Sequence, residues 1–545
     1  MRHALVPPFL LALLSAAPVV AQAQTLPDAG RLLQEQAPRL QPPKESPGVQ
    51  IERPPALITL PGGATVTLQT VTFVGNTVLT GTALQEVIAD AIGQSFDIAG
   101  LRKLAERVSS HYRANGYPFA LAYLPPQSMD DSRLTIAIVE GRYGSITALG
   151  NPELSALANE FLAPLKPSAV IESSAMERAT LILDDQPGIK VAPLMRPGKE
   201  AGTGDLEVYV EREPGFSGSL MADNYGHRYT GEHRLTASAQ WDAPFMFGDQ
   251  VMARFIRSEN GMTMGSLGYS LPLGGSGLRA SVGYSVMRYT LHLTPTNGNG
   301  EARVSSLGLS YPLIRSQQAN LSLSLGLQHK DLDDITTLTI NRTESDSVPL
   351  SLQFDRRDSF AGGGVTYGTL SYTRGRLALD ATQKQADTLG TAGRFDHWNL
   401  DLARMQALPD NLSLYGRVSL QTARKNLHSS EGFSVGGPSG VRAYPGGEGN
   451  GDEGWLTQVE LRYAIGAWSP YLFHDSGRVD INAKGSNPLT DNGRRSISGA
   501  GVGVRYQAGD WTLDAALAGK THGGVQTADT ADRGPHAWVT ATTRF

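Results

Sequence analysis

The segment Ala319–Lys330 reads ANLSLSLGLQHK, and its side chains alternate between two chemical types. Four leucines from Leu321 to Leu327 fall on one face of an extended chain, and serine, glycine and glutamine fall on the other. A period of two is the pattern of a β-strand with one apolar and one polar face. The segment therefore predicts a strand whose two faces meet different environments.

The same period continues from Pro214 to Phe545. Strands of about ten residues in an even number are typical of an outer-membrane barrel. The 61 glycines and the 18% of charged residues also suit a long β-region with many turns. We therefore predict an all-β transmembrane barrel of sixteen antiparallel strands over residues 214–545. The strands are expected to be centred near residues 219, 237, 254, 267, 284, 307, 325, 351, 369, 400, 416, 459, 471, 501, 515 and 540.

The alternative for such a pattern is a soluble β-sandwich. A sandwich would usually show fewer strands, and its polar face would point outward instead of lining a lumen. The sequence ends on HAWVTATTRF, in which Val539, Ala541 and Thr543 share the register of Phe545. We expect this segment to be the final strand that closes the barrel.

The first residues read MRHALVPPFLLALLSAAPVVAQAQT. Two basic residues precede an apolar stretch that runs to Val20, and Ala21-Gln22-Ala23 is a small-x-small cleavage site, which is the layout of a secretory signal peptide. We assign residues 1–23 to that peptide, cut after Ala23. A membrane anchor is the alternative, but three prolines interrupt the stretch and no stop-transfer flank follows. The absence of cysteine fits an exported chain that uses no disulfides.

Residues 24–66 divide into a short helix and a linker. Asp28–Gln36 is predicted to be helical with Asp28 as its N-cap, so we assign residues 24–37 to an N-terminal helix. Residues 38–66 are rich in proline, which favours an extended and semi-rigid chain. A disordered leader explains the composition of these residues equally well.

Residues 67–142 and 143–213 show the same predicted element order, β-α-α-β-β, and form a tandem repeat. The expected elements of the first repeat are a strand at 68–74, helices at 80–91 and after Asp97, and strands at 118–124 and 133–139. Those of the second are a strand at 143–149, helices at 152–162 and 173–184, and strands at 189–195 and 206–210.

Several classes of function lack support in the sequence. A net charge of −5 gives no electrostatic basis for a nucleic-acid partner. His474 and Asp475 are adjacent, but neighbouring strand residues point to opposite faces, so they cannot share a site. No nucleophile motif or zinc spacing accompanies the eleven histidines. We therefore predict no enzyme activity, no cofactor and no metal.

One connection in the barrel has an unusual composition. The stretch Gly436–Trp455 reads GGPSGVRAYPGGEGNGDEGW and contains eight glycines around the single cation Arg442. Glycine-rich backbone is soft, so a lone arginine within it needs a partner elsewhere to hold a fixed position. The thirteenth predicted strand contains Phe473-His474-Asp475-Ser476-Gly477.

These features together resemble a known family. Val441-Arg442-Ala443-Tyr444 looks like the VRGY/F loop motif, and residues 473–477 match the F-x-D-x-G strand motif, of the two-partner secretion transporters (TpsB proteins). A signal peptide, a short helix, a proline-rich linker, two POTRA-type repeats and a sixteen-stranded barrel are similar to that family along the whole chain. Ala443 stands where the family motif has glycine.

The resemblance implies that the loop folds into the lumen and that Arg442 meets Asp475. Guanidinium and carboxylate form bidentate bonds of defined geometry, which suits such a pair. The alternative is that Arg442 is solvated and that Asp475 is a separate charge on the barrel wall. The resemblance assigns the loop lock to Val441, Arg442, Ala443, Tyr444, Phe473, Asp475 and Gly477.

The resemblance also implies a function. The protein would be an outer-membrane pore with periplasmic N-terminal domains that secretes a large partner exoprotein, such as a haemolysin or adhesin with an N-terminal secretion domain. It would be a monomeric barrel in contact with outer-membrane lipid. A barrel-assembly insertase of the same superfamily, or a passive porin, is the alternative, although an insertase would normally carry more repeats and a porin needs none.

A β-α-α-β-β domain leaves a sheet edge open, and an extended polypeptide can add to such an edge as a further strand. We therefore expect the repeats to capture the partner mainly through backbone at edge strands. A role as simple spacers is the alternative. The candidate residues are Leu121, Tyr123, Leu134 and Ile136 in the first repeat and Leu206, Val208 and Val210 in the second.

Overall fold

The structure is a computed structural model. It describes residues 27–36, 40–43, 48–51, 62, 64–128, 132–291, 298–336, 339–485, 493–529 and 532–545. The predicted signal peptide and most of the predicted linker lie outside these residues. In the described part of the chain, no helix is long and apolar enough to cross a membrane.

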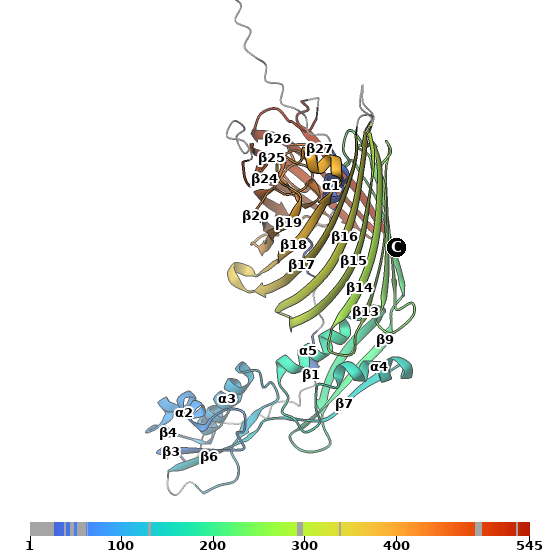
Figure 1. Ribbon diagram of the computed structural model, residues 1–545. Helices are drawn as coiled ribbons and strands as arrows, with labels where there is room; N and C mark the ends of the chain where they lie inside the picture. The colour runs from blue at the N-terminus through green and yellow to red at the C-terminus, as the bar shows by residue number, and fades with distance from the viewer. Residues whose placement is uncertain are drawn as a thin grey trace, which may run out of the picture.

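Sixteen antiparallel strands form a closed barrel, as predicted, and each predicted strand centre lies inside one of them (Figure 1). Leu325 and Leu327 are about half exposed on the outer wall, whereas Lys330 of the same strand is buried inside. The strands are β10 (Phe216–Asp223), β11 (Arg234–Asp242), β12 (Gln250–Ser258), β13 (Thr263–Pro272), β14 (Arg279–Leu291), β15 (Gly298–Arg315), β16 (Ala319–Thr336), β17 (Ile340–Asp358), β18 (Gly364–Leu379), β19 (Gly393–Ala407), β20 (Leu412–Ala423), β23 (Glu453–Tyr463), β24 (Trp468–Asp480), β25 (Arg494–Ala508), β26 (Trp511–His522) and β27 (His536–Arg544).

The barrel closes where its first and last strands meet. Residues Ser219–Asp223 of β10 pair antiparallel with residues Thr540–Arg544 of β27. Closure leaves no unpaired strand edge in the wall, so the backbone groups of the wall are satisfied within the barrel. Three short elements lie in the connections: η2 (Phe360–Gly362), α6 (Ala381–Ala386) and η3 (Ser429–Glu431), and the strand pair β21 (Phe433–Ser434) and β22 (Asn450–Gly451) lies in the β20–β23 connection.

The first repeat has the predicted element order. Its elements are β2 (Val66–Thr67), β3 (Thr70–Val74), α2 (Gly81–Val87), η1 (Ala89–Ala91), β4 (Ser95–Phe96), α3 (Ile98–Ala114), β5 (Leu121–Tyr123) and β6 (Arg133–Val139). The side chain of Asp97 caps α3 by accepting from the Gly100 N–H. The main sheet has the order β3-β6-β5, so β6 is its central strand.

The second repeat consists of β7 (Arg142–Gly150), α4 (Pro152–Leu162), α5 (Ser173–Asp184), β8 (Ile189–Pro197) and β9 (Thr203–Arg212). Its sheet has the order β1-β8-β9-β7. Strand β1 (Gln50–Ile51) comes from the predicted linker and pairs in parallel with Leu194 and Met195 of β8. This part of the linker is therefore ordered, and it covers the β8 edge of the sheet.

The second repeat contacts one end of the barrel, and the first repeat extends beyond it (Figure 1). Arg315 at the β15–β16 turn forms a two-bond ion pair with Asp185, at 2.7 Å for each bond. Arg178 of α5 donates to the Pro312 carbonyl at 2.7 Å. These contacts identify the barrel end that carries the repeats, and the long strands β14–β19 reach the opposite end.

Candidate functional site

The connection between β20 and β23 folds back into the barrel, where its tip is completely covered. Val441, Ala443 and Tyr444 have no exposed surface, and they pack in one cluster with Phe473 of β24 and Trp538 of β27. A Cβ atom on Gly477 would come within 2.9 Å of the Cβ of Val435, so glycine there allows the loop to lie against the wall.

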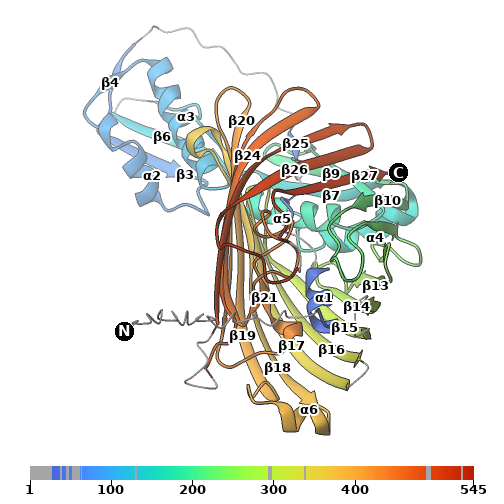
Figure 2. The ribbon, with the colours of Figure 1, turned by 90° about the horizontal axis from the view of Figure 1, so that it is seen from above.

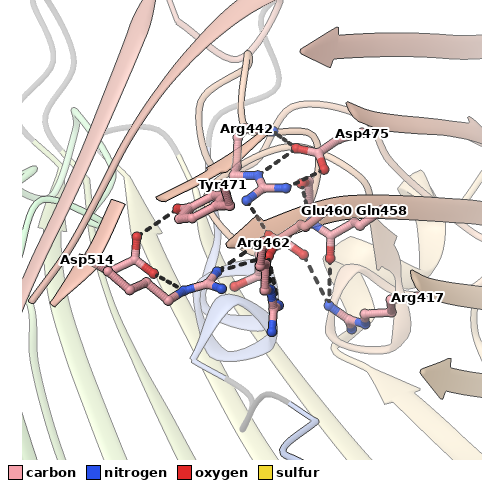
Figure 3. Close-up of polar contacts among 11 residues, drawn as sticks. Arg417, Arg442, Gln458, Glu460, Arg462, Tyr471, Asp475 and Asp514 are labelled. Carbon is pink, nitrogen blue, oxygen red and sulfur yellow. Dashed lines mark hydrogen bonds and ion pairs between the residues drawn. The ribbon is translucent and has the colours of Figure 1, made fainter. Parts of the chain in front are cut away.

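Arg442 and Asp475 form a bidentate ion pair at the centre of this cluster (Figure 3). The Nε and Nη2 atoms of Arg442 donate to the two carboxylate oxygens of Asp475, both at 2.7 Å. The backbone N–H of Arg442 adds a third bond to the same carboxylate at 3.1 Å. Asp475 has no exposed surface and Arg442 is 6% exposed, so the pair is screened from bulk water.

Aromatic side chains hold Arg442 from its other sides. The guanidinium carbon lies 3.6 Å from the ring centre of Phe473, a cation–π geometry that explains the aromatic residue of the strand motif. The indole N–H of Trp538 donates to the Arg442 carbonyl at 2.7 Å. Arg442 is therefore fixed through both its side chain and its backbone.

The neighbouring loop residues have separate anchors. The Tyr444 hydroxyl lies 2.9 Å from the His522 carbonyl and 3.0 Å from the Gly524 carbonyl. Ala443 stands where the family motif has glycine, and its φ is not positive. A Cβ atom on Gly499 of β25 would overlap the Ala443 methyl group. The bare backbone of Gly499 therefore makes room for the alanine.

Sequence reasoning missed a second carboxylate, Glu460 of β23. It accepts from Arg442 Nη1 at 2.6 Å and from Arg462 at 2.7 Å (Figure 3). It also accepts from Arg505 at 3.1 Å. Arg505 continues the network to Asp514, which also accepts from the Tyr471 hydroxyl at 2.7 Å. All of these wall residues lie at inward positions of their strands, so the period of two combined with charge could have indicated that they line the lumen, but not which of them pair.

Helix α1 (Ala29–Glu35) lies inside the barrel, against β14–β16 and the η3 turn of the same connection (Figure 2). Asp28 caps the helix as predicted and accepts from the Arg31 N–H at 2.8 Å. Asp28 also accepts from the Ser429 hydroxyl of η3 at 2.7 Å, and the Ala29 N–H donates to Asp334 of β16 at 2.9 Å. Helix α1 therefore bridges the barrel wall and the β20–β23 connection, which also carries Arg442.

The expectation that all seven candidate capture residues lie on edge strands was wrong for five of them. Leu134 and Ile136 are buried on β6, the central strand of the first repeat. Leu206, Val208 and Val210 are buried on β9, which pairs with β8 on one side and β7 on the other. Alternation predicts which residues lie in a core, but it does not reveal which strand becomes an edge.

Leu121 and Tyr123 do lie on an edge strand, β5, and are 53% and 43% exposed. Donors alternate in direction along a strand, so Ala122 is the residue of β5 whose N–H points away from β6. That N–H already donates to the Ser109 hydroxyl of α3 at 2.9 Å. This donor of the edge is therefore already used within the repeat, and capture mainly through backbone stays a prediction.

Models of known protein families match both the barrel region and the first repeat. A family model described as haemolysin secretion/activation protein ShlB/FhaC/HecB matches residues 202–506, and a model of the ShlB-type POTRA domain matches residues 66–141. The heme/hemopexin transporter protein HuxB of Haemophilus influenzae is 26% identical over 465 residues, which cover 82% of each chain.

Solved structures show the same fold. CdiB from Escherichia coli matches with a TM-score of 0.72 at 20% identity, covering 89% of this chain and 91% of that one. BamA from Haemophilus ducreyi, lacking POTRA domains 1–3, matches with a TM-score of 0.50 at 14% identity, covering 88% and 100% of the two chains.

The barrel, the repeats and the inward loop define an outer-membrane transporter. The family model spans more than half of the chain, so the protein belongs to the haemolysin secretion/activation family of the ShlB/FhaC/HecB type. The resemblance to two-partner secretion transporters is confirmed.

Proposed function

We propose that the protein captures one large exoprotein through that partner's N-terminal secretion domain and passes it unfolded through the barrel. One observation carries the proposal: the lumen contains α1 and the β20–β23 connection, and both are joined to the wall by polar contacts that can be exchanged. The wall itself is a closed hydrogen-bonded ladder that can persist while these segments move.

The proposal includes an arrangement of domains. Residues 24–37 act as a plug and 38–66 as its tether, while 67–142 and 143–213 are periplasmic repeats that precede a monomeric barrel at 214–545. The contact of the second repeat with one barrel end supports this arrangement. An insertase would normally carry more repeats, and a passive porin would have no use for them.

The capture surface that we propose is the β5 edge of the first repeat. Leu121 and Tyr123 are exposed there, beside helix α3. The corresponding β8 edge of the second repeat is covered by β1 from the linker. An extended partner segment would therefore bury the two β5 side chains and gain about 1.5–3 kcal/mol for each one that becomes fully buried.

Replacing Leu121 and Tyr123 together by serine is expected to weaken binding of the secretion domain by about tenfold or more. Binding of the purified protein to that domain can be measured by calorimetry, and the partner can be measured in the medium of co-expressing cells. Val74→Ser is the matched control, because Val74 is 55% exposed on β3, the opposite edge strand of the same sheet. Equal binding by the double variant and wild type would rule out capture at β5.

Glu35 makes the stability of the docked plug helix α1 depend on pH. Its Oε1 atom is buried without a hydrogen-bond partner and faces Gly447 of the β20–β23 connection. Burial raises the pKa of Glu35 from 4.5 to about 7, although the charges of Arg31 and Arg234 act in the opposite direction. The docked helix therefore holds a proton more tightly than the released helix does. Docking gains stability below pH 4.5, and this gain is lost as the pH rises through about 7.

We expect wild-type channels in planar bilayers to open about tenfold more often at pH 8 than at pH 5. Glu35→Gln keeps the shape of the side chain and removes its titration, so its opening frequency should change much less over this range. His227 also lies near Gly447, but burial lowers its pKa to about 4, so it stays neutral between these pH values. An unchanged pH response in Glu35→Gln would contradict the role of Glu35.

A further inference from the structure

The outer wall changes character at the barrel end opposite the repeats. On β16 the outward series of leucines ends at Leu327 and continues with the polar residue His329. On β18 and β19 the aromatic residues Tyr372 and Trp398 face each other in register, with ring centres 4.8 Å apart. Aromatic girdles mark the two membrane interfaces of outer-membrane barrels. This level is therefore the interface with the outer leaflet.

Three exposed arginines lie immediately beyond this girdle. Arg374 and Arg376 follow Tyr372 on the outward face of β18, and Arg394 is on the outward face of β19. The register places Arg376 directly opposite Arg394. Like charges that face each other across two strands destabilise a sheet, so this pairing has a cost unless an anion lies between them.

The described part of the protein does not supply that anion. Asp346 is opposite Arg376 on β17, but its carboxylate is 2.7 Å from His329 Nδ1. Asp396 is opposite Arg374, and it pairs with Arg424 at 3.4 Å. Among the residues that the structure describes, no ion pair or hydrogen bond involves the side chains of the three arginines.

The three arginines also line one groove on the outer wall, with a volume of about 1000 Å³. Its opposite side is apolar and is formed by Tyr284, Leu307 and Leu327, which are 50%, 56% and 54% exposed. Gly375 and Gly393 are among its lining residues, so part of it has no side chains. A ligand with an anionic head and hydrocarbon chains matches both sides of the groove.

We propose that this groove binds lipid A, the phosphorylated and acylated glucosamine disaccharide of the outer leaflet of outer membranes. Guanidinium groups suit phosphate because they donate paired N–H bonds of fixed geometry. A phosphate group between Arg376 and Arg394 neutralises their repulsion, and the acyl chains lie against Leu307 and Leu327. The site lies on the outer wall, apart from the lumen and from the capture surface.

The test uses full-length protein in detergent, titrated with bisphosphorylated lipid A and followed by native mass spectrometry. The triple variant Arg374→Ser, Arg376→Ser and Arg394→Ser should bind about one hundredfold more weakly, because each arginine near an anionic lipid surface contributes about fivefold. The matched control replaces Arg257, Arg288 and Arg303 by serine, which removes the same charge from other outward positions, and it should bind like wild type.

Dephosphorylated lipid A and phosphatidylglycerol are the comparison ligands, and both should bind at least about tenfold more weakly than bisphosphorylated lipid A. Equal affinity for phosphatidylglycerol would mean a general anionic lipid site and would overturn the assignment to lipid A. Equal affinity of the triple variant and the control would overturn the site itself. Gel mobility of the unheated protein verifies that each variant is a folded barrel. If the triple variant does not fold, the single variant Arg376→Ser replaces it and is expected to bind about fivefold more weakly than wild type.

Discussion

Replacing either Arg442 or Asp475 by alanine is expected to reduce secretion of the partner by more than tenfold while the barrel still assembles. Breaking a buried ion pair costs about 3–5 kcal/mol, because a buried charge loses its partner. The loss is largest in Arg442→Ala, since in Asp475→Ala the guanidinium of Arg442 keeps its bond to Glu460. In Arg442→Ala, Asp475 would lose both side-chain bonds from Arg442 and would keep only the bond from the backbone N–H of residue 442. The loop would then leave its fixed position, but the wall is held by its own closed ladder of strands.

A double-mutant cycle on the amount of secreted partner separates a lock from two independent residues. If Arg442 and Asp475 act as one unit, the double alanine variant secretes no less than either single variant. If the factor by which the double variant reduces secretion equals the product of the two single-variant factors, the residues act independently and there is no lock.

The matched control for this cycle is Arg404→Ala. Arg404 forms the same kind of two-bond pair with Asp358, at 2.8 and 2.9 Å, between strands β19 and β17.

The structure also predicts that exchanging the charges of Arg442 and Asp475 fails to restore secretion. An aspartate at position 442 would face Glu460, which accepts from Arg442 at 2.6 Å in the native protein.

Deleting residues 24–37 is expected to raise single-channel conductance several-fold while secretion continues. The deletion removes α1, which lies inside the barrel against β14–β16 and η3 (Figure 2). Its contacts with Asp334 and Ser429 are hydrogen bonds that water can replace, so their loss does not damage the wall. Conductance in planar bilayers is the measurement.

Asp380→Ala is the control for the deletion, because it removes the N-cap of α6 in a different connection. Its conductance should equal that of wild type. An unchanged conductance after deletion of residues 24–37 would show that α1 does not restrict the pore. Conductance that rises together with a complete loss of secretion would show that the helix also takes part in transport.

Local patterns predicted most of the elements. Alternation over a few residues gave the positions of all sixteen barrel strands, and helices α4 and α5 begin and end at the predicted residues. The helix N-caps Asp28 and Asp97 were also predictable from the sequence, because a capping side chain bonds to a backbone N–H only three residues along the chain. Such features depend on neighbours in sequence, so the sequence contains the information needed to find them.

The sequence by itself therefore determined the strands and the repeats, and the resemblance of two short motifs to a known family implied the pairing partner of Arg442. Only the tertiary structure decided that β9 is a central strand, that β1 covers the edge of β8, and that Glu460 joins the ion pair. These outcomes depend on which strands become neighbours and in which register the barrel closes. Contacts between distant segments form only with that closure, and the alternation of apolar and polar residues does not encode them.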